Sequence, residues 1–115
     1  MKSTMIYSKW DIVLVPFPFT DLTTLKKRPG LIVSPDTYNK GADIVISFIT
    51  SKIDRDKRLG DYLIEQWKLA QLPKPSLLRM KFATIEKSII IKKIGKLSEL
   101  DRSVFRQKLL KFFDD

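Results

Sequence analysis

The sequence contains neither cysteine nor histidine, and these two absences exclude much of common enzyme chemistry. Without cysteine the chain forms no disulfide, no zinc–thiolate site and no thiol nucleophile. Without histidine it lacks the usual general base at neutral pH and the commonest metal ligand in proteins. Any catalysis is therefore carried out by carboxylates, hydroxyl groups, lysines, arginines or tyrosines.

Long apolar segments are missing as well. No apolar run approaches the roughly 20 residues that span a bilayer, and the N-terminus lacks the apolar region of a signal peptide. We therefore expect a cytoplasmic protein with no membrane partner. The chain has 115 residues, of which 43% are hydrophobic, and this predicts a single domain over residues 1–115 with a modest core.

Positive charge is abundant. The chain has 22 lysines and arginines against 13 acidic residues, which gives a formal net charge of +9. Such an excess favours a polyanionic partner, meaning nucleic acid, an acidic protein or a membrane surface. A soluble basic protein without such a partner is the alternative that charge alone leaves open, and the placement of the cations along the chain favours the first interpretation.

Runs of β-branched and aromatic residues predict short strands, at residues 10–17, 30–34, 43–50, 62–67, 77–85 and 88–97. Pro16 and Pro18 cannot donate to a strand ladder, so pairing of the first strand is expected to end near them. Residues 98–113 predict a surface helix with Ser98 as the N-cap, whose apolar residues recur at helical spacing and pack as one stripe on a sheet. Five or six strands and one terminal helix predict a mainly β fold, either a small barrel or a strongly curled sheet.

The segment VPFPFTDLTTLKKRPG, from Val15 to Gly30, places hydroxyl groups and cations between two core strands. Pro29 restricts Arg28 to extended backbone geometry, which predicts that Arg28 lies where a loop enters a core strand. A guanidinium fixed there binds a phosphate through two parallel hydrogen bonds, which a flexible lysine does poorly. An ordinary solvated loop with an arginine at its edge is the alternative.

Two further segments carry hydroxyl groups or charge at strand ends. Thr50 is followed by a serine and a lysine at the exit of the third strand, although a plain strand residue is the alternative reading. Asp54 and Asp56 are spaced faintly like a calcium loop, but cations follow them and the required glycine is absent, so we expect no metal there. That loop is either simply exposed to solvent or contacts the backbone of a nucleic acid through its cations.

The residues expected to contact a nucleic acid share a hydroxyl group or a positive charge at strand ends or in the charged loop: Thr20, Lys26, Lys27, Ser51, Lys52, Lys57, Arg58 and Arg79. Aromatic residues that could stack on unpaired bases are Trp10, Trp67, Tyr38 and Tyr62. For Trp10, which lies beside a core strand, packing is the competing interpretation.

Three segments follow one another in an order typical of a known family: WDIVLVPFPFTDLTTLKKRPGLIVS, DIVISFITSK and KPSLLRMKFATIEKSIIIKKIGKLS. They resemble the MazF/PemK-like toxins of bacterial type II toxin–antitoxin systems, and the similarity runs from about Trp10 into the final helix. The first segment is the most specific, because D-[IV]-V-x-V-P-F-P-F-T-D followed by K-R-P is an unusual string.

The resemblance implies an SH3-like, CcdB/PemK-like barrel of about five to seven strands with a C-terminal helix, generally a homodimer. It implies metal-independent, sequence-selective endoribonuclease cleavage of single-stranded RNA to a 2′,3′-cyclic phosphate, with no cofactor. It also implies an antitoxin whose acidic, partly disordered segment covers the RNA groove. The catalytic arginine of the family falls on Arg28, and its strand-end threonine falls on Thr50.

The chain departs from the family at two places. Many members have glycine before the aspartate of the first strand, where this chain has Trp10. The loop before Arg28 is shorter than the glycine-rich, glutamate-containing form of some members and reads DLTTLKK. A third catalytic group on that loop and the preferred RNA sequence are therefore not predicted.

The two lines of reasoning join in one mechanism. The 2′-hydroxyl of a nucleotide attacks its own phosphate, Arg28 neutralises the transition state, and Thr50 either holds a phosphate oxygen or orients the attacking hydroxyl. Arg28 itself, Asp21 and a backbone-held water are all open as the general base. The rival function is binding without chemistry, by a basic barrel that docks on nucleic acid or on a protein such as a topoisomerase.

Overall fold

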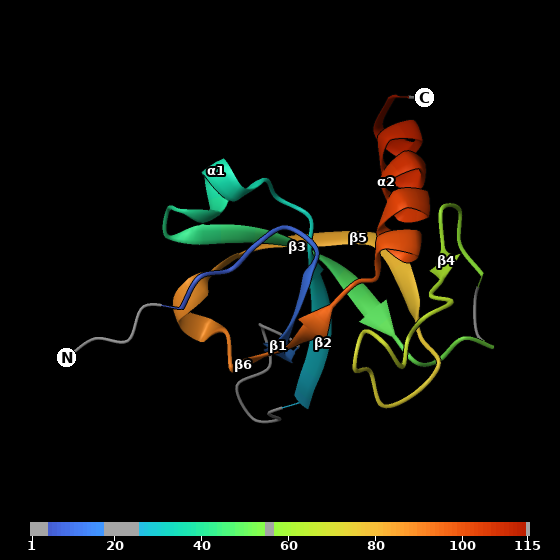
Figure 1. Cartoon of the computed structure of the whole chain (residues 1–115), viewed down its shortest axis with the longest axis horizontal. Coiled ribbons are helices and arrows are strands. Elements are labelled where there is room, and N and C mark those ends of the chain that lie inside the picture. Colours follow the sequence, from blue (N-terminus) through green and yellow to red (C-terminus); the bar gives the residue numbers. More distant parts are fainter. Residues whose placement is uncertain (1–4, 18–25, 55–56, 115) are drawn as a thin grey trace.

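In a computed structural model that describes residues 5–17, 26–54 and 57–114, six strands form one antiparallel sheet. The strands are β1 (Asp11–Phe17), β2 (Lys26–Ile32), β3 (Asp43–Thr50), β4 (Tyr62–Leu63), β5 (Leu77–Glu86) and β6 (Lys92–Lys96). The helices are α1 (Asp36–Asn39), the single 3-10 turn η1 (Lys87–Ile89) and α2 (Glu99–Asp114). The sheet order is β4-β5-β3-β2-β1-β6, and the sheet curls into a half-barrel (Figure 1). The predicted mainly β fold with a C-terminal helix is confirmed.

Three predicted boundaries are wrong. Residues 26–28 were expected in a loop but belong to β2, which lengthens the hairpin with β1. The predicted strand at 62–67 stops at Leu63, because the side chain of Asp101 binds the backbone N–H groups of Glu65 and Gln66 and turns the chain. The last strand begins at Lys92 rather than at residue 88, because η1 occupies residues 87–89.

Both faces of the sheet are covered by residues of the same chain. Side chains alternate along a strand, so Ile12 and Leu31 enter one core cluster, which also contains Phe105 of α2. Val13 and Ile46 enter a second cluster on the other face. The near-continuous apolar sequence of β1 is therefore explained by core clusters on both of its faces.

Helix α2 begins as predicted but packs less completely than predicted. The Oγ atom of Ser98 accepts a hydrogen bond from the backbone N–H of Asp101 at 3.1 Å, which is the N-cap interaction that the sequence indicated. Phe105 is fully buried, whereas Val104 is 39% and Phe113 is 68% exposed. The predicted apolar stripe is therefore only partly buried against the sheet, and the C-terminal half of α2 leaves apolar side chains at the surface.

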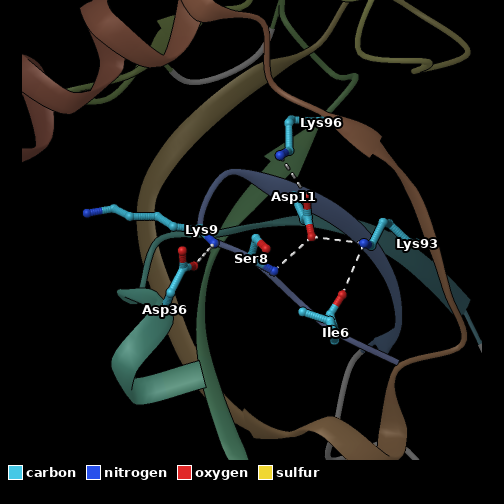
Figure 2. Close-up of polar contacts among 7 residues, drawn as sticks. All are labelled: Ile6, Ser8, Lys9, Asp11, Asp36, Lys93 and Lys96. Atoms are coloured by element: carbon cyan, nitrogen blue, oxygen red, sulfur yellow. Dashed lines mark hydrogen bonds and ion pairs between the residues drawn. The ribbon is translucent and has the colours of Figure 1, made fainter. Parts of the chain in front are cut away.

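The segment before β1 is held by a buried carboxylate. Asp11 is 2% exposed, and its Oδ2 atom accepts a hydrogen bond from the Ser8 N–H at 2.8 Å and lies 3.2 Å from Lys93 Nζ (Figure 2). Lys93 Nζ also donates to the Ile6 carbonyl at 3.1 Å. Trp10, which stands where the family resemblance leads one to expect glycine, has a φ of 76°. That left-handed conformation favours glycine, so the substitution is accommodated with backbone strain.

None of the helices in the described ranges is long and apolar enough to cross a bilayer.

Candidate nucleic-acid interface

Proline ends the ladder between β2 and β3. The last pair between these strands is Gly30 with Phe48. On the β1 side, the Ile32 carbonyl accepts a hydrogen bond from the Trp10 N–H. On the β3 side, the Val33 N–H donates a hydrogen bond to the Val45 carbonyl. The backbone N–H and C=O groups of successive residues point to opposite sides of a strand. Counting back from Ile32, which faces β1, the backbone groups of Leu31 face β3, and the next that do so are those of Pro29. Because Pro29 has no N–H, it cannot extend the ladder.

A groove of about 460 Å³ lies where the two strands are no longer paired. Its described lining comes from β1, β2, β3, β5 and the segments that follow β3 and precede β5. Arg28 and Thr50 both line it. If the Gly30–Phe48 register were continued by two residues, Arg28 would lie opposite Thr50, and paired residues of an antiparallel ladder point to the same face. The structure therefore brings the two predicted catalytic side chains to one cavity.

The hydroxyl group of Thr50 has a defined orientation. Its Oγ1 atom accepts a hydrogen bond from the Lys52 backbone N–H at 3.1 Å. A hydroxyl group has two acceptor positions and one donor, and this contact occupies an acceptor position. The hydroxyl proton of Thr50 can therefore be donated to a ligand in the groove.

The groove is strongly positive. Six cations are among its described lining residues, and no carboxylate is: Arg28, Lys52, Arg58, Lys74, Arg79 and Lys81. Behind the lining, Asp61 Oδ2 accepts from the Arg58 N–H at 2.9 Å and lies 3.7 Å from an Arg79 guanidinium nitrogen. Within the described ranges no group of three or more acidic residues could hold a metal ion. The arrangement suits a chain of anionic groups such as phosphates or carboxylates.

The other residues predicted to bind RNA divide into three groups. Ser51, Lys52, Arg58 and Arg79 line the groove with the two predicted catalytic residues. Lys26, Lys27 and Lys57 are exposed but are not among the lining residues. Thr20 and Asp21 lie outside the described residues.

Sequence reasoning missed the aromatic residues of the groove. Phe17 and Phe48 line it, with their ring centroids 5.2 Å apart and their planes at 89°. None of the four aromatic residues proposed from the sequence is among the lining residues. Phe17 and Phe48 are far apart in the sequence, and only the pairing of β1, β2 and β3 brings them together. Both residues lie in apolar strand sequences, and nothing in those sequences distinguishes them from residues buried in the core.

A second cavity, of about 650 Å³, lies on the other face of the sheet and is lined by residues of both α1 and α2. Its lining is mostly apolar and includes Tyr38, Phe82 and Phe113. Lys9 is the one charged residue among its described lining residues. Because it contains neither paired cations nor a carboxylate, we assign no chemistry to this cavity.

The comparison with family models gives one match. A model described as PemK-like, MazF-like toxin of type II toxin–antitoxin systems matches residues 8–113. None of the curated proteins matches the chain.

Several solved structures have the same fold. A mycobacterial endoribonuclease in complex with its cognate antitoxin is 15% identical, has a TM-score of 0.75, and aligns over 94% of this chain and 95% of that chain. The Mycobacterium tuberculosis toxin MazF-mt6 is 18% identical, with a TM-score of 0.70, over 90% of this chain and 96% of that one. MazF from Deinococcus radiodurans is 15% identical, with a TM-score of 0.73, over 97% and 100% of the respective chains. At these identities the likeness is one of fold.

Proposed function

We propose that this chain, which belongs to the PemK-like and MazF-like toxins of type II toxin–antitoxin systems, is an endoribonuclease that cleaves single-stranded RNA. The observation that carries the proposal is the groove itself, in which Arg28 and Thr50 lie among five further cations. The fold shared with structures named as endoribonucleases supports it. We also propose that the protein acts in the cytoplasm, where messenger RNA is available.

The reaction that we propose is a transesterification within one nucleotide. The 2′-oxygen forms a bond to the adjacent phosphorus, the bond from phosphorus to the 5′-oxygen breaks, and the products are a 2′,3′-cyclic phosphate and a 5′-hydroxyl. The proton of the 2′-hydroxyl is lost and the 5′-oxygen gains one, so no water is consumed. Because the nucleophile is already next to the phosphorus, positioning and charge supply most of the rate, and the proposed reaction uses no metal.

Arg28 and Thr50 have distinct roles in this reaction. The Arg28 guanidinium binds the phosphate oxygens, whose negative charge increases in the transition state. Thr50 donates its hydroxyl proton to a phosphate oxygen, because its contact with the Lys52 N–H occupies an acceptor position. We propose that Thr50 holds the phosphate; its second acceptor position leaves open the other role, in which it orients the 2′-hydroxyl. Removing one preorganised donor of this kind typically lowers the rate by about 10²–10³-fold.

The test is cleavage of a long single-stranded RNA in EDTA by four proteins: the wild type, Arg28→Ala, Arg28→Lys and the control Arg106→Ala. Arg106 is an exposed residue of α2, a helix that contributes no residue to the described groove lining. We expect discrete fragments ending in a cyclic phosphate from the wild type and the control. Arg28→Ala should lose cleavage while remaining folded. Arg28→Lys should retain RNA binding but cleave poorly, because an ammonium cannot donate two parallel hydrogen bonds to a phosphate as a guanidinium does.

If Arg28→Ala cleaves RNA as fast as the wild type does, the proposed mechanism is wrong. Binding of RNA without any cleavage by the wild type would support the rival function, a basic half-barrel that docks without chemistry.

We propose two partners besides RNA. The first is an antitoxin with an acidic segment, supported by a solved endoribonuclease of the same fold in complex with its cognate antitoxin. We propose that this segment occupies the same groove, because the described groove lining contains six cations and no carboxylate. Such a segment should compete with RNA, and its affinity should fall as salt rises. We also propose a homodimer, which sedimentation at several protein concentrations can test.

A further inference from the structure

Two phenylalanines and a lysine form a cluster at the edge of the cationic groove. Lys81 Nζ lies 5.5 Å from the ring centroid of Phe48 and 5.9 Å from that of Phe17. We propose that these three residues form a subsite in which one unpaired base of the RNA stacks beside the phosphate held by Arg28. This inference rests on the proposed function, because it names the part of the RNA that the groove recognises besides its backbone.

The position of the two rings argues against core packing as their whole role. Val15 and Ile46 also line the groove on this face of the sheet but are 2% and 0% exposed, whereas Phe17 and Phe48 are only half-buried. Phosphate binding alone requires cations and has no use for apolar rings. Every base has an aromatic face, and aromatic side chains inside a positive groove are the combination that binds single-stranded nucleic acid.

The perpendicular arrangement of the rings suits a flat ligand. Because the planes meet at 89°, the pair forms a corner. A base placed in that corner stacks face to face on one ring and meets the other in the edge-to-face geometry that aromatic groups prefer.

The rings lie at the correct spacing from the proposed reaction centre. Phe17 follows Val15, the cross-strand partner of Arg28, by two residues, and Phe48 precedes Thr50 by two. Residues two apart on a strand point to the same face and are about 7 Å apart. A single nucleotide spans a distance of this order between its phosphate and its base. The stacked base therefore belongs to a nucleotide next to the bond that is cleaved.

Lys81 gives the subsite a second contact. Its side chain is exposed, and cation–π contacts at exposed sites are weak. When a base stacks in the corner, the flexible lysine stem allows the ammonium to move from the rings to a neighbouring phosphate. Lys81 thus covers the rings in the free protein and contacts the backbone in the complex.

The experiment measures binding separately from cleavage. The probe is a 12-nucleotide single-stranded RNA of mixed sequence, 2′-O-methylated so that the 2′-oxygen cannot attack, and a set of the same RNAs with one base removed at each position in turn. The proteins are the wild type, Phe48→Leu, Phe48→Tyr and Lys81→Gln. Leucine keeps an apolar side chain but has no aromatic face, and tyrosine keeps the face. Melting temperatures identify any variant that does not fold, and Phe17→Leu is the second variant for that case.

We expect removal of one particular base to weaken binding to the wild type by about 5- to 150-fold, the range for loss of one stacked base. Phe48→Leu should bind the intact RNA that much more weakly and should be insensitive to removal of the same base. Phe48→Tyr should behave like the wild type. Lys81→Gln should bind more weakly at low salt but remain sensitive to that base, and its salt slope should fall by about 0.7.

Each remaining outcome has a definite meaning. If Phe48→Leu and Phe17→Leu fold and bind every RNA as the wild type does, the stacking inference is wrong while the proposed cleavage is untouched. If the wild type binds the RNA but the unmodified RNA is not cleaved, the proposed function fails and the base-removal series still decides the stacking. If the wild type binds no RNA, both are overturned.

Discussion

Replacing Asp101 by asparagine should destabilise the protein strongly, although the two side chains have nearly the same shape. Asp101 is 0% exposed. Its Oδ1 atom accepts hydrogen bonds from the Tyr62 hydroxyl and from the Glu65 N–H, and its Oδ2 atom accepts from the Gln66 N–H and from Ser98 Oγ. The carboxylate therefore joins the first turn of α2 to the chain segment that follows β4.

An asparagine in either orientation leaves one backbone N–H without an acceptor. If its amide nitrogen replaces Oδ1, the Glu65 N–H loses its partner; if it replaces Oδ2, the Gln66 N–H does. A buried unsatisfied donor costs about 1–3 kcal/mol, and hydrogen bonds to a neutral acceptor contribute about 1 kcal/mol less each than bonds to a charged one. Together these effects predict a loss of about 3–5 kcal/mol in the free energy of unfolding, a large share of the roughly 5–15 kcal/mol of a typical domain.

Urea unfolding followed by tryptophan fluorescence measures the change, since Trp67 packs against the same core cluster. The matched control is Glu99→Gln, the same chemical change at an exposed position in the same helical turn. It should cost no more than about 1 kcal/mol, through the helix dipole alone. A loss below about 1 kcal/mol for Asp101→Asn would mean that these buried hydrogen bonds do not hold the segment.

Three further predictions concern other parts of the molecule. Burial, and then the hydrogen bond to Asp101, raise the pKa of Tyr62 above its usual value near 10. The contribution of Tyr62 to stability should therefore be fully present below pH 10 and be lost as the pH rises above it, and Tyr62→Phe should remove part of this fall in unfolding measured between about pH 9 and 11. Lys57→Ala should make the slope of log RNA affinity against log salt concentration shallower by about 0.7 for each lost phosphate contact. Lys108→Ala, a change on α2, is the control; if both variants have the same slope, the loop that contains Lys57 does not contact RNA. Asp11→Asn should lower the free energy of unfolding by about 1–2 kcal/mol, since its lysine partners are partly exposed and can be solvated again; an unchanged urea midpoint would contradict that value.

Much of the fold could be predicted because its signals are local. The alternation of β-branched residues gave the strand at 43–50 with its observed bounds, and Ser98 marked the start of α2. Pro29 likewise acts locally, since the same proline that restricts the backbone of Arg28 ends the ladder with β3. In these cases the sequence feature and its structural effect lie within a few residues.

The errors have a common origin in contacts between distant residues. The sequence from Tyr62 to Trp67 has strand-like composition, but Asp101, more than 30 residues away, binds its backbone and turns it. Likewise, the apolar residues of α2 predict one stripe packed on a sheet, but the area of sheet that α2 covers depends on how the sheet curls.

The sequence by itself determined which chemistry is open to this protein, since a chain without histidine and cysteine must work with guanidinium, ammonium, hydroxyl and carboxyl groups. It also determined where most strands run and that the backbone of Arg28 is extended before Pro29. Only the tertiary structure decided what lies beside that arginine. The folded sheet brings Thr50 to the same groove as Arg28, beyond the last pair of β2 and β3, and the convergence of three strands brings Phe17 and Phe48 together. Register and curvature arise from the sum of many distant packing contacts, and no short stretch of sequence contains that sum.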